Sequence, residues 1–421
     1  MTRRRIAVVY GSGSSFDSGY DVEVTPPQQG NKPRVAHLIS PPCDHNFFSN
    51  EVAWDAASRY PSIELFIQKY FQVSFEQPCD LGLEEVWSAV DLNHKHIRLE
   101  TYRWEGETSL YLRERINRLH EDIDPQDTNP ALRHSANNPI GGNEFKFFGD
   151  CGRHLRHLIY RIYGKPKLRD GAKDNFAELH KYLINQECDI EYVTFNYDSC
   201  LERSLKRSNY DFGYLSDLET PSAGLFRRDF PHILKMHGSL TWKHRWSAVQ
   251  PIELSQTFQP WDQRGDDLNF LAVKPDYTVV GYLQPAVIPP TWLKQDINDD
   301  ARAENRLSQL ILHQWRSALL AFQLADGIIV VGYSFPLTDF HAQRLFRLAA
   351  MLRDDATHLP LLYCTGEEPE KAGTHLSFVP DGKLKVEAVQ GFSHLLEGTA
   401  LEDWITQIRS KPTGARISAI H

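Results

Sequence analysis

The sequence predicts an α/β protein built around a parallel β-sheet. Short apolar runs rich in β-branched residues, such as residues 5–10 and 327–331, are typical of strands buried on both faces. Other stretches repeat apolar residues at three- and four-residue spacing, most clearly residues 302–325. That spacing is typical of helices that cover a sheet. The alternation of the two kinds of segment predicts the α/β class.

The first strand runs directly into a glycine-rich stretch, Gly11-Ser12-Gly13-Ser14-Ser15. Many dinucleotide-binding sheets open in this way, because glycine lets backbone N–H groups approach a pyrophosphate closely. The stretch therefore predicts a Rossmann-like sheet. The next glycine is Gly19, so the spacing departs from G-x-G-x-x-G, and a plain tight turn explains the stretch equally well.

Between this stretch and the next strand, the chain predicts a loop and then a helical module. Residues 17–49 are polar and carry five prolines, which predicts a long loop. Residues 51–187 have mainly helical spacing and are interrupted by a weakly structured stretch at 120–143. The predicted domains are a Rossmann-like domain formed by residues 1–50 and 188–410, an inserted helical module at 51–187, and a tail at 411–421.

The second half of the chain predicts the remaining elements of the sheet domain. Asp339 is placed to cap the N-terminus of a helix that runs through residue 348. The predicted strands are residues 190–194, 232–236, 327–331, 359–363 and, as an edge strand, 384–389. The predicted helices are residues 201–205, 302–325, 339–348 and 401–408. Residues 241–281 are predicted to be irregular, and residues 284–294 to form a rigid extended loop.

Composition narrows the class of protein. The 421 residues are 41% hydrophobic and 24% charged, which is ordinary for a folded soluble protein. The net charge of −9 argues against direct nucleic-acid binding. None of the six cysteines forms a C-x-x-C pair, so no zinc is expected. No run reaches the ~18 apolar residues of a membrane span. We expect a cytoplasmic protein.

Polar clusters follow three of the predicted strands, at Gly11, Asn196 and His237. In open α/β sheets, ligands bind beyond the carboxyl ends of the strands, so these clusters predict a site. Histidine exchanges a proton near neutral pH, which suits a general base. Taken alone, His237 is better explained by a turn at the end of a strand, and its place among the other clusters is what favours a catalytic role.

Four motifs at strand ends together resemble a known family. They are GSGSS at residues 11–15, TFNYD at 194–198, HGSLTW at 237–242 and GYSFPLTD at 332–339. In this order they resemble the prokaryotic sirtuin-like defence proteins of the sirtuin superfamily. The resemblance covers about residues 5–365 and implies a Rossmann-like sheet domain of sirtuin type, with an inserted helical module and no zinc module.

The resemblance also implies the site residues. His237 would be the general base near the ribose hydroxyls of NAD⁺, and Asn196 would position the nicotinamide ribose or the attacking water. Asp198 would hold the nicotinamide carboxamide. The implied cofactor-binding residues are Gly11, Gly13, Ser14, Ser15, Asp44, Asp198, Gly332 and Ser334.

One departure from the family pattern bears on the reaction. Protein-deacylating sirtuins carry a four-cysteine zinc module after the histidine motif, whereas residues 239–290 contain no cysteine. Water is then the expected acceptor, and the resemblance implies an NAD⁺ hydrolase (an NADase) in antiphage abortive infection. A protein deacylase and a non-catalytic subunit that binds NAD⁺ or ADP-ribose remain alternatives. A second departure, at residues 363–366, leaves the adenosine contacts open.

An NAD⁺ hydrolase that is always active would kill its host, so the activity should be gated. A chain of this kind resembles the subunit that forms homo-oligomers and assembles with a HerA-type ATPase. That partner comes from the resemblance alone.

Overall fold

The computed structural model describes most of the sheet domain and the helical module. The described residues are 3–24, 36–43, 46–103, 142–214, 225–226, 230–246, 282–288, 305–336, 339–352 and 358–410.

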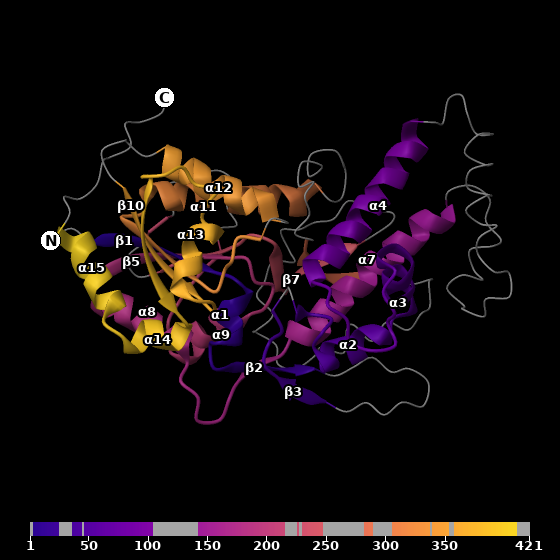
Figure 1. Cartoon of the computed structure of the whole chain (residues 1–421), viewed down its shortest axis with the longest axis horizontal. Helices are drawn as coiled ribbons and strands as arrows, with labels where there is room; N and C mark the ends of the chain where they lie inside the picture. The colour runs from indigo at the N-terminus through magenta and orange to yellow at the C-terminus, as the bar shows by residue number, and fades with distance from the viewer. Residues whose placement is uncertain are drawn as a thin grey trace.

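A six-stranded parallel sheet forms the core of one half of the molecule, and its parallel strands agree with the sequence prediction (Figure 1). Its strands are β1 (Arg4–Tyr10), β5 (Cys188–Thr194), β6 (Ile233–Lys235), β9 (Gly327–Val331), β10 (Leu359–Thr365) and β11 (Leu384–Gln390). They lie in the order β11-β10-β9-β1-β5-β6. Numbered by their sequence in the chain, this is the 3-2-1-4-5-6 order of a Rossmann sheet. Its topological switch point, where the strand order reverses, lies between β1 and β9.

The register of the parallel strands aligns the carboxyl ends of β1, β5, β6 and β9 with one another. Tyr10 pairs with Thr194 of β5 and with Val331 of β9. Thr194 in turn pairs with Lys235, the last residue of β6. The loops that follow these four strands therefore meet above one edge of the sheet.

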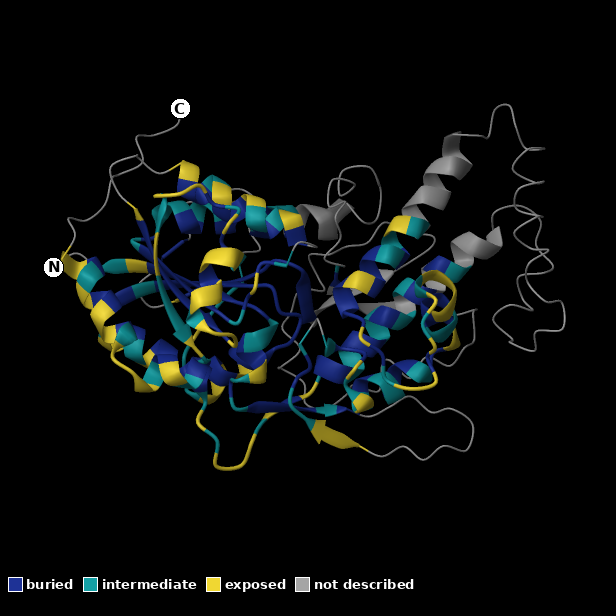
Figure 2. Ribbon diagram, in the orientation of Figure 1, coloured by how far each residue is buried: buried dark blue, intermediate teal, exposed yellow. Residues whose placement is uncertain are grey.

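Helices cover both faces of the sheet (Figures 1 and 2). One face packs against α11 (Asn305–Leu324), α12 (Phe340–Met351) and α13 (Ala372–His375). The other packs against α8 (Asn175–Asn185), α9 (Cys200–Arg207), α14 (Phe392–Glu397) and α15 (Ala400–Ser410). Residues of β1, β5, β9 and β10 are mostly buried on both sides, which is why these strands appear in the sequence as apolar runs without alternation.

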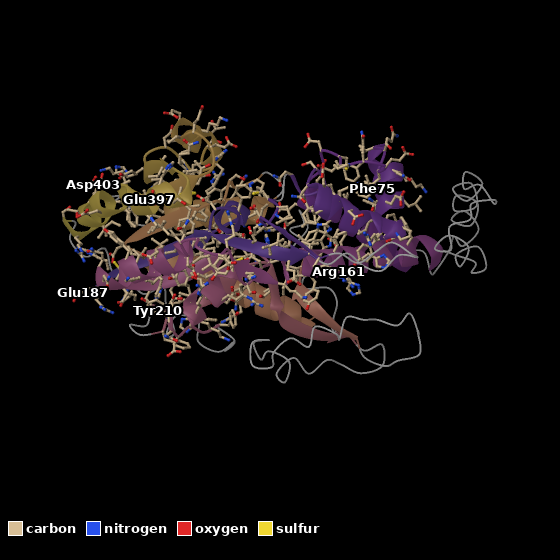
Figure 3. All side chains as sticks on the ribbon, turned by 90° about the horizontal axis from the view of Figure 1, so that it is seen from below. Phe75, Arg161, Glu187, Tyr210, Glu397 and Asp403 are labelled. Atoms are coloured by element: carbon tan, nitrogen blue, oxygen red, sulfur yellow. The ribbon has the colours of Figure 1, made fainter. Side chains whose placement is uncertain are left out.

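The helical module has a core of its own at the other end of the molecule (Figures 1 and 3). Figure 3 labels Phe75 and Arg161 in this part, far from Glu397 and Asp403 on the sheet domain. Its elements are α2 (Glu51–Ser58), α3 (Pro61–Phe66), the π-helical turn η2 (Ile67–Phe71), α4 (Leu83–Arg103) and α7 (Gly142–Tyr163). Tyr197 and Leu240, which follow strands of the sheet, are part of this core. The module therefore packs directly against the loops at the carboxyl edge.

Three sequence predictions were wrong in part. The predicted loop 17–49 contains β2 (Tyr20–Val24) and β3 (His37–Ile39), and β2 pairs antiparallel with both β3 and β4 (Pro166–Leu168). Residues 241–281 are not irregular from the start, because β7 (Gly238–Trp246) enters them. The predicted extended loop 284–294 begins inside β8 (Tyr282–Val287), which pairs with β7. These short strands depend on partners far away in the sequence, which no local pattern shows.

Two further differences are local. The glycine-rich stretch begins a short helix, α1 (Ser12–Phe16), and α14 was not predicted. Most of the stretch predicted to be weakly structured, residues 120–143, lies outside the described residues. None of the described helices is both long and apolar enough to cross a bilayer.

Candidate functional site

The turns after β1 and β9 touch at the switch point. Gly11 N donates to Val331 O over 3.0 Å, and Gly13 N donates to Gly332 O over 2.9 Å. Gly332 has φ +63°, and a Cβ there would lie 2.1 Å from Ser14 N. A Cβ on Gly11 would lie 2.6 Å from Gly332 O. The structure thus brings these predicted residues together, and the contact between the two backbones is by itself a sufficient reason for glycine.

Asn196, directly beyond β5, is bonded to the serines of α1. Its Nδ2 donates to Ser15 Oγ over 2.9 Å and to Ser14 Oγ over 3.2 Å, while Ser14 Oγ donates to Gly11 O. Asn196 is 8% exposed, and its buried Oδ1 has no hydrogen-bond partner among the described residues. A buried acceptor of this kind is unfavourable unless a donor reaches it, so it marks a place for a ligand or water group.

Asp198 is occupied by protein groups. Its Oδ2 accepts from Ser15 Oγ over 2.7 Å, and its Oδ1 accepts from Cys200 N over 2.9 Å. The buried Lys235 donates from Nζ to Asp198 O over 2.7 Å and pairs with Glu202 at 3.1 Å. These bonds fix the loop that presents Asn196. In this structure, both oxygens of the Asp198 carboxylate therefore accept hydrogen bonds that hold this loop in place.

The thiol nearest this network is not a nucleophile. Burial, followed by the charge of Asp198, raises the pKa of Cys200 well above its ordinary value. The thiol therefore stays protonated at neutral pH, and nucleophilic attack requires the thiolate.

His237 lies just beyond β6, shielded from solvent. Its side chain is 1% exposed, and its ring centroid lies 5.5 Å from that of Phe195 and 5.8 Å from that of Tyr197. These two aromatic residues are the sequence neighbours of Asn196. Trp315 of α11 contributes a third ring at 6.4 Å and donates from Nε1 to Met236 O over 2.9 Å. The structure thus places His237 and the Asn196 loop side by side.

A carboxylate meets the imidazole from the other side of the switch point. His237 Nε2 lies 3.2 Å from Asp339 Oδ2, and the Asp339 side chain is fully buried. Asp339 Oδ1 accepts from Ala342 N over 3.3 Å, which confirms the predicted N-cap of α12. Tyr333 OH donates to the same Oδ2 over 2.7 Å.

Asp339 is the residue that the sequence analysis missed as part of the site. Its N-cap position is visible locally, whereas its contact with His237 depends on the fold. In the sequence, the one indication that Asp339 belongs to the site is its position at the end of the fourth motif, residues 332–339.

The remaining predicted site residues are Ser334 and Asp44. Ser334 follows β9 and is exposed, near Gly332 in the chain. Asp44 lies outside the described residues. Beyond β10, Thr365 Oγ1 accepts from Glu367 N over 3.1 Å, a local turn bond. Among the described residues, no group of three or more His, Cys, Asp or Glu is arranged to hold a metal ion.

Comparison with known protein families finds a match in the part of the chain that contains Asn196 and His237. Residues 190–257 match the family model described as SIR2-like domain. The match begins inside β5 and contains Asn196, Asp198, Lys235 and His237. A search of curated proteins finds no match.

Solved Sir2 structures also resemble the chain, at low identity. A structure on the mechanism and regulation of Sir2 enzymes has 14% identity and a TM-score of 0.33, over 63% of this chain and 79% of that one. Sir2 with a p53 peptide and NAD⁺ has 12% identity and a TM-score of 0.28, over 67% and 85%. Sir2 with the inhibitor EX-527 has 11% identity and a TM-score of 0.30, over 55% and 71%. Likeness this distant carries no argument about the reaction.

The fold and the family match define a class. The protein is an α/β chain with a six-stranded parallel sheet and a SIR2-like segment at the carboxyl edge of that sheet. Beside the asparagine loop of this segment lies a buried histidine–aspartate contact.

Proposed function

We propose that the protein is an NAD⁺ hydrolase that releases nicotinamide and ADP-ribose. One observation carries the proposal. Asn196 and His237 lie beyond the carboxyl ends of two neighbouring strands of a 3-2-1-4-5-6 sheet, inside the segment that matches a SIR2-like domain. Ligands of such sheets bind in that place, and SIR2-like segments supply the link to NAD⁺.

The residues suit the bond that must break. Cleavage between nicotinamide and ribose leaves positive charge on the sugar carbon, and water then adds to that carbon and loses one proton. His237 would accept the proton, directly or through a ribose hydroxyl. Asn196 would position the water or the ribose through Oδ1, which has no partner among the described residues. Positioning and one base account for most of what such a reaction requires.

The site also requires gating. The His237 side chain is 1% exposed in this structure, as it would be in a site closed to NAD⁺. That agrees with a hydrolase that is held inactive in the resting cell. We propose that the protein acts in the cytoplasm in antiphage defence, as a homo-oligomer activated by a partner, for which a HerA-type ATPase is the first candidate.

Nicotinamide release tests the proposal. The purified protein, alone and with a HerA-type partner, is incubated with NAD⁺ and compared with His237→Ala and Asn196→Ala. We expect release by the wild type and a loss of at least about 100-fold in each variant, the usual scale for a general base. If neither wild-type preparation consumes NAD⁺, the proposal fails.

Two additions to the assay separate the alternatives. A deacylase would release nicotinamide only when an acyl-lysine peptide is present. A non-catalytic subunit would show a rise in melting temperature with NAD⁺ or ADP-ribose, without release.

A further inference from the structure

We infer that Asp339 is a positioning residue for His237, which holds the imidazole in the tautomer with the proton on Nε2 and makes Nδ1 the basic atom. This inference rests on the proposed hydrolase. It assigns to the reaction a residue that the sequence explains fully as a helix cap.

The hydrogen bonds around Asp339 fix its role as an acceptor. Oδ1 accepts from Ala342 N, and Oδ2 accepts from Tyr333 OH. Burial, followed by the charge of Asp339, raises the pKa of Tyr333 well above its ordinary value, so the phenol keeps its proton. With a donor on each oxygen, the side chain is a carboxylate, and Nε2 of His237 at 3.2 Å completes the set as an N–H donor.

The placement of the pair strengthens the interaction. Both side chains are at most 1% exposed, and a charge-assisted hydrogen bond away from water is about twice as strong as a neutral one. His237 comes from the end of β6, whereas Asp339 comes from the loop after β9. The bond therefore spans β5 and β1, and it fixes the imidazole relative to the switch point.

The neighbours of the pair come from several elements. Tyr333 stacks on Phe195 at 4.2 Å, with an interplanar angle of 5°, which holds the phenol against Asp339. Titratable groups on the surrounding described elements include Tyr197 after β5, whose ring lies 5.8 Å from that of His237, Glu84 of α4, whose charge acts on Tyr333, and His341 of α12, whose ring lies 6.2 Å from that of Trp315. Asp339→Asn leaves all of these side chains unaltered.

Another helix cap in the chain shows what capping alone requires. Asp174 caps α8 through Oδ1, which accepts from Ala177 N over 3.3 Å, and Tyr20 OH donates to its Oδ2 over 2.8 Å. Its arrangement resembles that of Asp339 with two differences: Ser204 Oγ also donates to Asp174 Oδ1 over 2.6 Å, and no histidine of the described residues bonds to Asp174. Asp174→Asn is therefore a matched control for Asp339→Asn.

The test compares these two variants with the wild type. Asparagine can still cap a helix, but its single oxygen cannot also accept from His237. In serine proteases, the same change beside a histidine base lowers kcat by roughly 10⁴-fold through the wrong tautomer. For Asp339→Asn we expect a fall in kcat of about 10²–10⁴-fold, a KM within about threefold of wild type, and an ascending limb of the pH–rate profile moved to lower pH. The limb moves because a carboxylate no longer favours the protonated imidazole. Asp174→Asn should keep the wild-type kcat and pH profile.

Histidine ¹⁵N NMR gives a readout that does not need activity. Spectra of histidine-labelled protein, with His237 assigned by its loss in His237→Gln, should show an Nε2–H tautomer in the wild type and an Nδ1–H tautomer in Asp339→Asn. A variant with wild-type kcat, pH profile and tautomer overturns the inference while the hydrolase proposal stands. If the wild type releases no nicotinamide but the tautomer still depends on Asp339, the hydrolase proposal fails and the positioning role stands.

Discussion

Replacement of Gly332 by alanine tests whether the two turns at the switch point must touch. An added Cβ would lie 2.1 Å from Ser14 N and 2.4 Å from Gly13 C, both backbone atoms that no side-chain rotation can move. Ordinary contact begins at 3.4 Å, so α1 would have to retreat by 3.4 − 2.1 = 1.3 Å. A retreat of that size breaks the 2.9 Å bond from Gly13 N to Gly332 O.

The free energy of unfolding should fall by about 3 kcal/mol. A left-handed φ of +63° costs an alanine roughly 1–2 kcal/mol, and the lost backbone hydrogen bond adds about 1 kcal/mol, with further loss from strain in α1. Gly171→Ala is the matched control, because Gly171 has φ +76° and no atom within 4 Å of the added Cβ. It should cost only the φ term, roughly 1–2 kcal/mol.

Urea unfolding at 25 °C measures both variants, and the comparison removes the entropy change of the unfolded chain that they share. We expect Gly332→Ala to be less stable than Gly171→Ala by about 1–2 kcal/mol. A difference below about 0.5 kcal/mol, within the error of such comparisons, would refute the argument that close approach requires glycine here.

Three further predictions concern stability. Burial lowers the pKa of His180 to about 4, so the unfolded chain binds its proton first and stability is lost as pH falls from about 6.5 to 4. His180→Gln should remove about 3 kcal/mol of that pH dependence, measured by urea unfolding at pH 7.5 and at low pH. Lys235→Met should cost about 3–5 kcal/mol, because it leaves Glu202 buried without its cation, and Lys235→Met/Glu202→Met should recover much of the loss. Asn50→Ala should cost about 1 kcal/mol in thermal unfolding, since Asn50 Oδ1 caps α2 by accepting from Val52 N and Ala53 N.

Each of these predictions has a control. For His180, replacement of the exposed His394 by glutamine should leave the pH dependence unchanged, and an equal effect in both variants would contradict the burial argument. For Lys235, strict additivity of the two single changes would show that the pair is not coupled. For Asn50, aspartate keeps the capping oxygen, so Asn50→Asp should retain wild-type stability.

The central sheet could be predicted because parallel strands between two helical layers are apolar throughout. Residues 327–331 form a strand whose five residues are all buried, so an apolar run alone identifies it. The strand β2 could not be identified in the same way. Its alternation of Tyr20, Val22 and Val24 with acidic residues lies in a proline-bearing stretch, and its partners β3 and β4 come later in the chain.

The sequence predicts which residues of the candidate site follow the ends of strands, but not which side chains contact one another there. Asn196 and His237 stand directly after apolar runs, so their place at the carboxyl edge follows from the pattern. The contact of His237 with Asp339 does not follow from the pattern, because the contact depends on how β5 and β1 are aligned between β6 and β9. The engagement of Asp198 by Ser15 depends on the fold in the same way.

The place of β1 in the middle of the sheet has a consequence for folding kinetics. Its residues are made before those of both its partners, since Arg4 pairs with Cys188 and Ile6 with Gly327, on either side of it. Contacts between positions so far apart close slowly, because the entropy of a long loop must be lost before the contacts form. During synthesis the apolar face of β1 stays exposed until most of the chain has emerged, and exposed strands of this kind aggregate. Productive folding in the cell should therefore depend on chaperones that shield this strand.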